Sequence, residues 1–160
     1  MKTILLSVVI AMTCVVNAVS GNLNDFAYNS EVNGNRVETQ TVYKVVNKKY
    51  LKHHLKYSFT YDVQNRVTSK EVLKWNIEKE AYEKQYCLNF IYENNETTVE
   101  FALWNGKEQA YNEIKSKAIY QINRDGINYQ SYEWNQKEND WNLVTEHNVN
   151  REEIKLLANK

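Results

Sequence analysis

The sequence predicts an all-β fold, an antiparallel meander of about seven strands built from ~30-residue hairpin repeats and followed by a short C-terminal helix. Three observations predict it. Three Trp-Asn pairs recur at intervals of 29 and 30 residues, at Trp75, Trp104 and Trp134. A second ring follows each tryptophan seven residues later, at Tyr82, Tyr111 and Trp141. The composition, with 12 Tyr, 4 Trp and no Pro, favours strands.

Each unit contains a long strand, a tight turn, a shorter strand that ends in Trp-Asn, and a polar loop. The triplets before the turns begin 31 and 30 residues apart, at Phe59, Phe90 and Tyr120. Asp125-Gly126 in the third turn predicts a two-residue type I′ hairpin, in which both central residues need positive φ. Strands joined by short loops usually pair as neighbours. The pattern leaves open whether the sheet is open, closed into a barrel or folded into two layers.

Residues 1–18 have the pattern of a signal peptide. A positive start at Lys2 precedes an apolar run from Ile4 to Val16, and Val16-Asn17-Ala18 fits cleavage after Ala18, with Ser20 as a near alternative. An uncleaved anchor and a lipoprotein attached through Cys14 are the other interpretations. The apolar run is short for an anchor, because a helix needs about 20 apolar residues to cross a bilayer. We therefore expect a periplasmic, cell-surface or secreted protein without an integral membrane segment after cleavage.

The remaining chain divides into three parts. Residues 19–41 are rich in Asn and predict an irregular N-terminal segment. Residues 42–149 form the predicted hairpin domain. Residues 150–160 predict a short helix, because Asn150 and Glu153 resemble a capping box and Ile154, Leu157 and Ala158 share one helical face.

Composition excludes several classes of protein and site. The 20 basic residues balance the 20 acidic ones, so nothing favours nucleic acid as a partner. Cys87 is the single cysteine left after cleavage, which predicts no internal disulfide and a buried thiol that acts as a small hydrophobe. His53 and His54 are adjacent, and neighbouring residues in a strand point to opposite faces, so no metal site is expected. No motif requires a cofactor.

Two sets of residues carry the functional hypotheses. Trp75, Trp104 and Trp134 form a candidate aromatic ladder. If the rings are exposed, we expect them to stack on a glycan or bind a protein; if they are buried, we expect them to pack neighbouring units together. The leading hypothesis is an exported, non-enzymatic binding or scaffold module with no identifiable ligand. The alternative is an enzyme that acts on an extracellular polysaccharide through two carboxylates, Glu71 and Glu100, which occupy equivalent strand positions.

The block from Val42 to Thr145 resembles a family of short exported Bacteroidetes proteins of unknown function. The resemblance depends on the signal peptide, the Phe-x-Tyr turns, the Trp-Asn strand ends and a proline-free composition rich in Asn, Lys and Tyr. It implies no activity, ligand or cofactor. Separately, the stretch from Tyr61 to Val67 is similar to one YD-repeat half-motif of large exported shell proteins. Asn65 stands where a Gly usually precedes the Arg there, so we interpret this likeness as shared hairpin chemistry.

Overall fold

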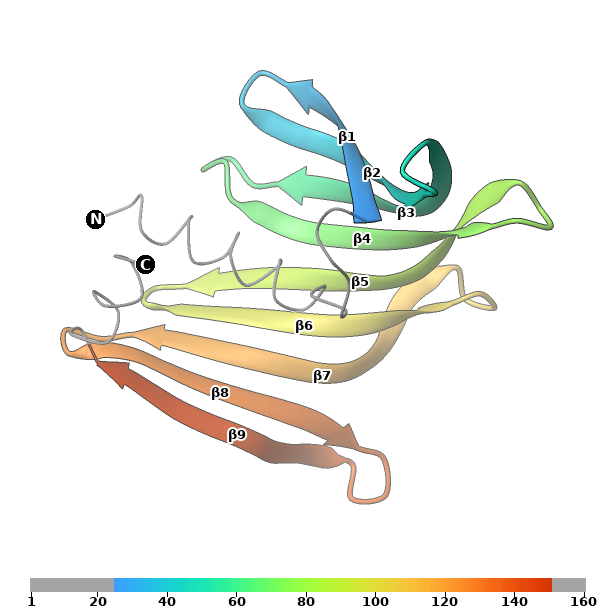
Figure 1. Ribbon diagram of the computed structural model, residues 1–160. Helices are drawn as coiled ribbons and strands as arrows, with labels where there is room; N and C mark the ends of the chain where they lie inside the picture. Colours follow the sequence, from blue (N-terminus) through green and yellow to red (C-terminus); the bar gives the residue numbers. More distant parts are fainter. Residues whose placement is uncertain (1–24, 151–160) are drawn as a thin grey trace.

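The computed structural model describes residues 25–150, which form a single antiparallel sheet of nine strands. The strands lie in the sheet in the order of the sequence, so each pairs with the next one along the chain (Figure 1). The all-β meander is confirmed, with nine strands in place of the expected seven, and the expected helix falls on residues 151–160, outside the described part. The strands are β1 Phe26–Asn33, β2 Arg36–Val46, β3 Tyr50–Tyr61, β4 Val67–Asn76, β5 Ala81–Glu93, β6 Glu96–Asn105, β7 Ala110–Ile122, β8 Gly126–Asn135 and β9 Asp140–Asn150.

The additional strands arise where an irregular segment was expected, because β1 and the first half of β2 occupy residues 26–41. The expectation of an irregular segment over 19–41 is therefore wrong for this part. Polar pairs join the two strands, including the Thr39 hydroxyl that donates to Glu31 at 2.7 Å. Such pairs do not produce the alternation of apolar residues by which a strand is recognised. Asn33 pairs with Arg36, so Gly34 and Asn35 form the two-residue loop, with Gly34 at a φ of 60°.

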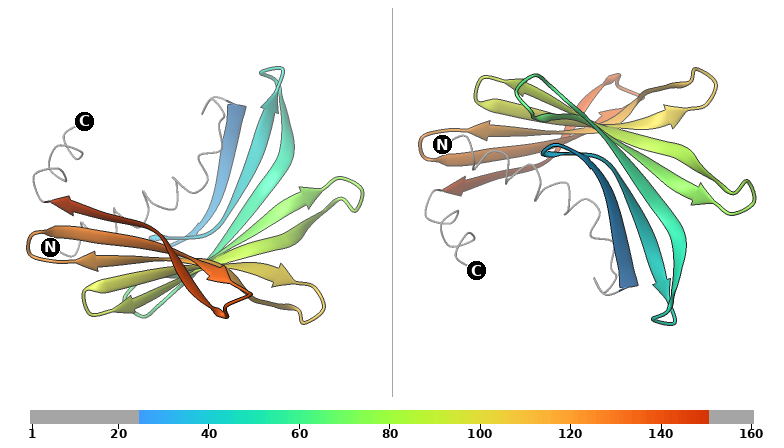
Figure 2. Two further views of the ribbon diagram at one scale, coloured as in Figure 1. Left: turned by 90° about the horizontal axis from the view of Figure 1, so that it is seen from below. Right: turned by 90° about the horizontal axis from the view of Figure 1, so that it is seen from above.

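The sheet is curved and open. Its outer strands, β1 and β9, do not pair with each other, and Figure 2 shows β1 to β3 rising out of the plane of β7 to β9. Register shifts interrupt six of the eight strand pairs, and such bulges increase twist and bending. We call the side that carries Val72, Leu88 and Phe90 the concave face and the side that carries Cys87 and Ala102 the convex face.

The buried core is small and lies mainly on the concave face. Val42, Tyr57 and Val72 form a buried cluster across β2, β3 and β4, and Leu88 and Phe90 continue it on β5. Most other apolar side chains of the sheet are half-buried. This distribution is expected where the described strands form one layer, since a second layer is what normally covers a sheet face completely.

The turn between β3 and β4 is held by one carboxylate. The Asp62 Oδ1 atom accepts hydrogen bonds from the backbone N–H groups of Gln64 and Arg66, both at 2.9 Å, and Asp62 Oδ2 pairs with the Arg66 guanidinium at 2.7 Å. Asn65 has a φ of 64°, a left-handed conformation that Asn tolerates better than most residues. This geometry explains why Asn65 can replace the glycine of the similar half-motif.

The turn between β7 and β8 differs from the expected type I′ hairpin around Asp125-Gly126. The Asn123 N–H donates to the Gly126 carbonyl at 2.9 Å, so Arg124 and Asp125 are the central residues. Gly126 instead begins β8, where it lies against the edge strand. A Cβ atom on Gly126 would lie 2.1 Å from the carbonyl oxygen of Val149 in β9. The glycine is therefore required by this close approach of two strands.

The Trp-Asn signature marks the loops at the opposite end of the sheet. The Oδ1 atoms of Asn76, Asn105 and Asn135 each accept hydrogen bonds from the N–H groups two and three residues later, at 2.9–3.4 Å. Each loop then ends with a residue of positive φ, which is about 50° in every case, at Glu80, Gln109 and Asn139. Asparagine follows each tryptophan because its side chain caps the loop.

Replacing Glu80 or Gln109 by Gly should raise the free energy of unfolding by about 0.5–1 kcal/mol. A left-handed conformation costs a side-chain-bearing residue roughly 1–2 kcal/mol, and the flexibility of Gly in the unfolded chain offsets part of the gain. Thermal or urea unfolding of the variants tests this expectation. Glu78→Gly in the same loop is the control, since Glu78 has no positive φ, and it should lower stability. Equal effects at positions 78 and 80 would contradict this account.

Candidate functional site

The three tryptophans of the aromatic ladder lie on the convex face, near the Asn-capped loops. Each contacts the ring seven residues later across its hairpin, with centroid separations of 4.9 Å for Trp75–Tyr82, 4.9 Å for Trp104–Tyr111 and 5.2 Å for Trp134–Trp141. All three tryptophans are half-buried. They are therefore neither a fully exposed platform nor a fully buried core, and their role in binding stays a prediction.

Other side chains of the protein lie against Trp75, Trp104 and Trp141. His53 stacks on Trp75 with a centroid separation of 4.4 Å and an interplanar angle of 22°. The Lys84 ammonium lies 4.5 Å from the centroid of Trp104, and the Lys117 ammonium lies 4.4 Å from that of Trp141. These stacking and cation–π contacts occupy surface that a sugar ring would need. The arrangement favours an internal role for the ladder.

The two candidate carboxylates also lie on the convex face. Glu71 is opposite Cys87 in the β4–β5 register, and Glu100 is opposite Asn89 in the β5–β6 register. The Glu71 carboxylate lies 3.6 Å from the Lys84 ammonium, and Glu100 is opposite Lys117 on β7. Such cross-strand pairs of opposite charge are a common stabilising feature of sheets. Neither carboxylate lines the hollow described below.

Cys87 is buried, and its Sγ atom lies 3.4 Å from the Asn89 side-chain oxygen. Burial, assisted by the nearby Glu71 carboxylate, raises the pKa of the thiol to about 11.

Native protein at pH 8 should therefore react with a thiol reagent at least about tenfold more slowly than protein unfolded in urea, because the thiolate is the nucleophile. Ellman's reagent measures both rates. Equal rates would show that the thiol is accessible.

The adjacent histidines, His53 and His54, contact different parts of the molecule. His53 lies against Trp75, and its Nδ1 atom is hydrogen-bonded to the Tyr82 hydroxyl at 2.8 Å. The centroid of the His54 ring lies 5.5 Å from that of Phe26. Over residues 25–150, no group of three or more His, Cys, Asp or Glu side chains is placed to hold a metal ion. The described residues also contain no helix long and apolar enough to cross a membrane.

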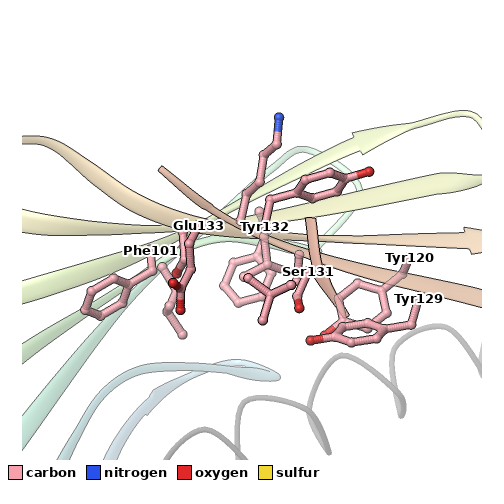
Figure 3. A pocket seen from close by; sticks show the side chains of 13 residues that line it. Phe101, Tyr120, Tyr129, Ser131, Tyr132 and Glu133 are labelled. Carbon is pink, nitrogen blue, oxygen red and sulfur yellow. The ribbon is translucent and has the colours of Figure 1, made fainter. Parts of the chain in front are cut away.

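A hollow of about 290 Å³ lies on the concave face of the described sheet. Figure 3 shows the side chains of Phe101, Tyr120, Tyr129, Ser131 and Glu133 directed to one side of the sheet and that of Tyr132 directed to the other. The hollow extends from β5 to β9. Its lining residues are Leu88, Phe90, Val99, Phe101, Ser116, Lys117, Ala118, Tyr120, Tyr129, Ser131, Tyr132, Glu133 and Val144.

The hollow exists because small side chains lie between large ones on the concave face. Ser116 is opposite Phe101 on β6, and Ala118 lies between Val99 on β6 and Ser131 on β8. The large rings of Tyr120 and Tyr129, whose centroids are 5.0 Å apart, close one end. Serine and alanine in the middle thus leave a depression with an apolar floor.

Few polar groups face this hollow, and they are of distinct kinds. Burial, together with the neighbouring Tyr129, raises the pKa of Tyr120 to about 12, so its phenol stays neutral and can donate a hydrogen bond. The Glu133 side chain is exposed, and its carboxylate forms no hydrogen bond or ion pair with any described residue. The hollow therefore combines an apolar floor with neutral hydroxyl groups and one negative charge.

Sequence reasoning missed these residues. Small residues at Ser116, Ala118 and Ser131 interrupt the rings on one face of β7 and β8, which is the only signal that could have indicated a depression. That signal is readable only when the register between the two strands is known.

The model of a family of unknown function, DUF3836, matches residues 1–122 of the sequence. The chain belongs to the DUF3836 family. The matched region ends at the last residue of β7, so β8, β9 and the part of the hollow that they form lie beyond it. Membership assigns no ligand and no enzymatic role to this DUF3836 chain, because the function of the family is unknown.

Solved structures of Bacteroidetes proteins are similar to this DUF3836 chain. A protein of unknown function from Bacteroides fragilis has a TM-score of 0.69 at 23% identity, covering 80% of this chain and 94% of its own. A DUF3836 protein from Bacteroides vulgatus has a TM-score of 0.52 at 31% identity, covering 54% and 88%. One from Parabacteroides distasonis has a TM-score of 0.55 at 17% identity, covering 61% and 90%. The comparison with curated proteins gave no match.

Proposed function

We propose that this DUF3836 chain is an exported, non-enzymatic binding module that holds its ligand in the hollow on the concave face. The observation that carries the proposal is the hollow itself. It is lined mainly by apolar side chains and tyrosines, with few polar groups, which is the usual composition of a ligand site. Over residues 25–150 the hollow lies on one face of a single sheet.

Export is the part of this proposal supported by the amino terminus. The basic start, the apolar run from Ile4 to Val16 and the small residues up to Ala18 fit a cleaved signal peptide. The ligand is then a protein or glycan of the periplasm, the cell surface or the surroundings.

The hairpins support the proposal that the scaffold is a set of structural repeats. Three consecutive hairpins share an asparagine-capped loop, a loop-closing residue of positive φ and a contact between a tryptophan and the ring seven residues later. Repeats of this kind stack on their neighbours and commonly present an extended concave surface for binding.

The contrast between the two faces favours binding over catalysis. The candidate carboxylates of the alternative, Glu71 and Glu100, lie on the convex face near lysines, away from the hollow. A pair of glycosidase carboxylates flanks the bond that is cleaved, whereas each of these carboxylates lies near a lysine of a neighbouring strand and outside the hollow. The enzymatic alternative would be established instead if the native chain cleaved a polysaccharide and the Glu71→Gln variant did not.

Binding of the chain from Val19 to a glycan array, combined with capture of envelope components from the source organism, tests the proposal. Ser131→Trp fills the hollow, and Gln130→Trp places the same ring on the opposite face of the same strand. We expect the captured ligand to be lost with Ser131→Trp and kept with Gln130→Trp. Loss with Trp104→Ala and retention with Ser131→Trp would move the site to the aromatic ladder.

A further inference from the structure

We infer that the partner of the hollow is an extended, cationic peptide segment of another protein, which pairs with β9 and sets apolar side chains into the hollow. This inference rests on the proposed function and specifies the class of ligand. Three features carry it: the charge of the hollow, its size, and its position beside β9, which pairs on one side only among residues 25–150.

The charge of the hollow is negative. Glu133 and Lys117 are the two ionisable residues of opposite charge that line it, but they lie on opposite faces. The Lys117 ammonium lies on the convex face, 5.3 Å from the centroid of Tyr132 and 4.4 Å from that of Trp141. The Glu133 carboxylate therefore faces the hollow without a cation beside it among the described residues. A lysine or arginine of a partner would supply that cation through a charge-assisted hydrogen bond.

The size of the hollow suits side chains better than a large cofactor. Its volume of about 290 Å³ is at the lower limit of the pockets that hold drug-sized molecules, roughly 300–1,000 Å³. The floor of Leu88, Phe90 and Val99 offers apolar surface, and the phenol groups of Tyr120 and Tyr129 offer hydrogen bonds at one end. One or two apolar side chains of a peptide fit such a space.

The hollow reaches the edge of the sheet at β9, whose outer side pairs with no described strand. Val144, the residue at the β8–β9 bulge, lines the hollow and is 55% exposed, and its neighbour Leu143 is 52% exposed. An unpaired edge with exposed apolar residues is a template for an additional strand. A strand added there would direct every second side chain to the concave face, which is how edge-binding domains combine affinity with specificity.

Two synthetic peptides of about nine residues test this inference. Both alternate Thr with inward-facing residues, Leu and Lys in one peptide and Leu and Glu in its twin. Calorimetry with the chain from Val19 should show the Lys peptide binding about tenfold more tightly, and hydrogen exchange should show slower exchange of the β9 amides when it is bound. Glu133→Gln should reduce the preference to about twofold or less. The control Glu100→Gln, on the convex face, should keep it.

The results that overturn the inference differ from those that overturn the proposed function. Equal binding of the two peptides, or a preference that survives Glu133→Gln, removes the cationic peptide. Failure of both peptides to bind, while Ser131→Trp still abolishes capture of an envelope ligand, removes the peptide and keeps the hollow as the site. Protection of the β9 amides that depends on protein concentration without peptide would assign the edge to a second copy of the chain.

Discussion

Gly126→Ala is expected to lower the free energy of unfolding by about 3 kcal/mol or more. The new methyl group would lie 2.1 Å from the Val149 carbonyl oxygen and 3.0 Å from the Asn150 Cα atom, both of which are backbone atoms that cannot rotate away. β9 must move or the start of β8 must distort, and enforced backbone strain or overpacking costs roughly 1–3 kcal/mol for each strained element. Urea unfolding measured by circular dichroism gives the value.

Gly106→Ala is the matched control for this substitution. An added Cβ atom there would meet only the Trp104 side chain, at 3.9 Å, and Gly106 does not have a positive φ. The change should therefore alter stability by less than about 1 kcal/mol. Similar losses for the two alanine variants would mean that the approach of β9 to Gly126 is not what requires the glycine.

Phe90→Ala is expected to cost about 3 kcal/mol, because truncation of a buried phenylalanine removes its apolar contacts and leaves a cavity. The side chain is 5% exposed and lies on the floor of the hollow. The neighbouring Ile91 is 41% exposed on the other face, so Ile91→Ala should cost less than about 1 kcal/mol. Equilibrium unfolding of the two variants compares the faces. A larger loss for Ile91→Ala would mean that the convex face holds the main core.

The hairpins were predictable because their loops depend on local chemistry. Asn76, Asn105 and Asn135 cap their loops with hydrogen bonds to residues two and three positions later, so the Trp-Asn spacing shows where each hairpin reverses. The β1–β2 hairpin has no tryptophan, and its polar pairs, such as Gln40 with Ser30, do not create an apolar alternation. The strand count was therefore too low at the amino-terminal end.

The candidate site was less predictable because it depends on how distant residues align. The tryptophans recur in sequence, but the covering of Trp75 by His53 depends on the register of β3 with β4. Likewise, Ser131 faces Ala118 only in the observed β7–β8 register, and a shift of one residue would turn Ser131 to the other face. A hollow formed by five strands has no counterpart in any single stretch of sequence.

The strand order permits this chain to change in length at one edge of the sheet. Since every strand pairs only with the strands just before and after it in sequence, a hairpin can be gained or lost at the β9 side without rethreading the remainder. The family match ends with β7, and the Bacteroides vulgatus relative aligns with 54% of this chain while using 88% of its own length. The pairing of β1 to β7 therefore does not depend on the β8–β9 hairpin. Because β8 and β9 contribute Tyr129, Ser131, Glu133 and Val144 to the hollow, a change in that hairpin would reshape the hollow and leave the pairing of β1 to β7 intact.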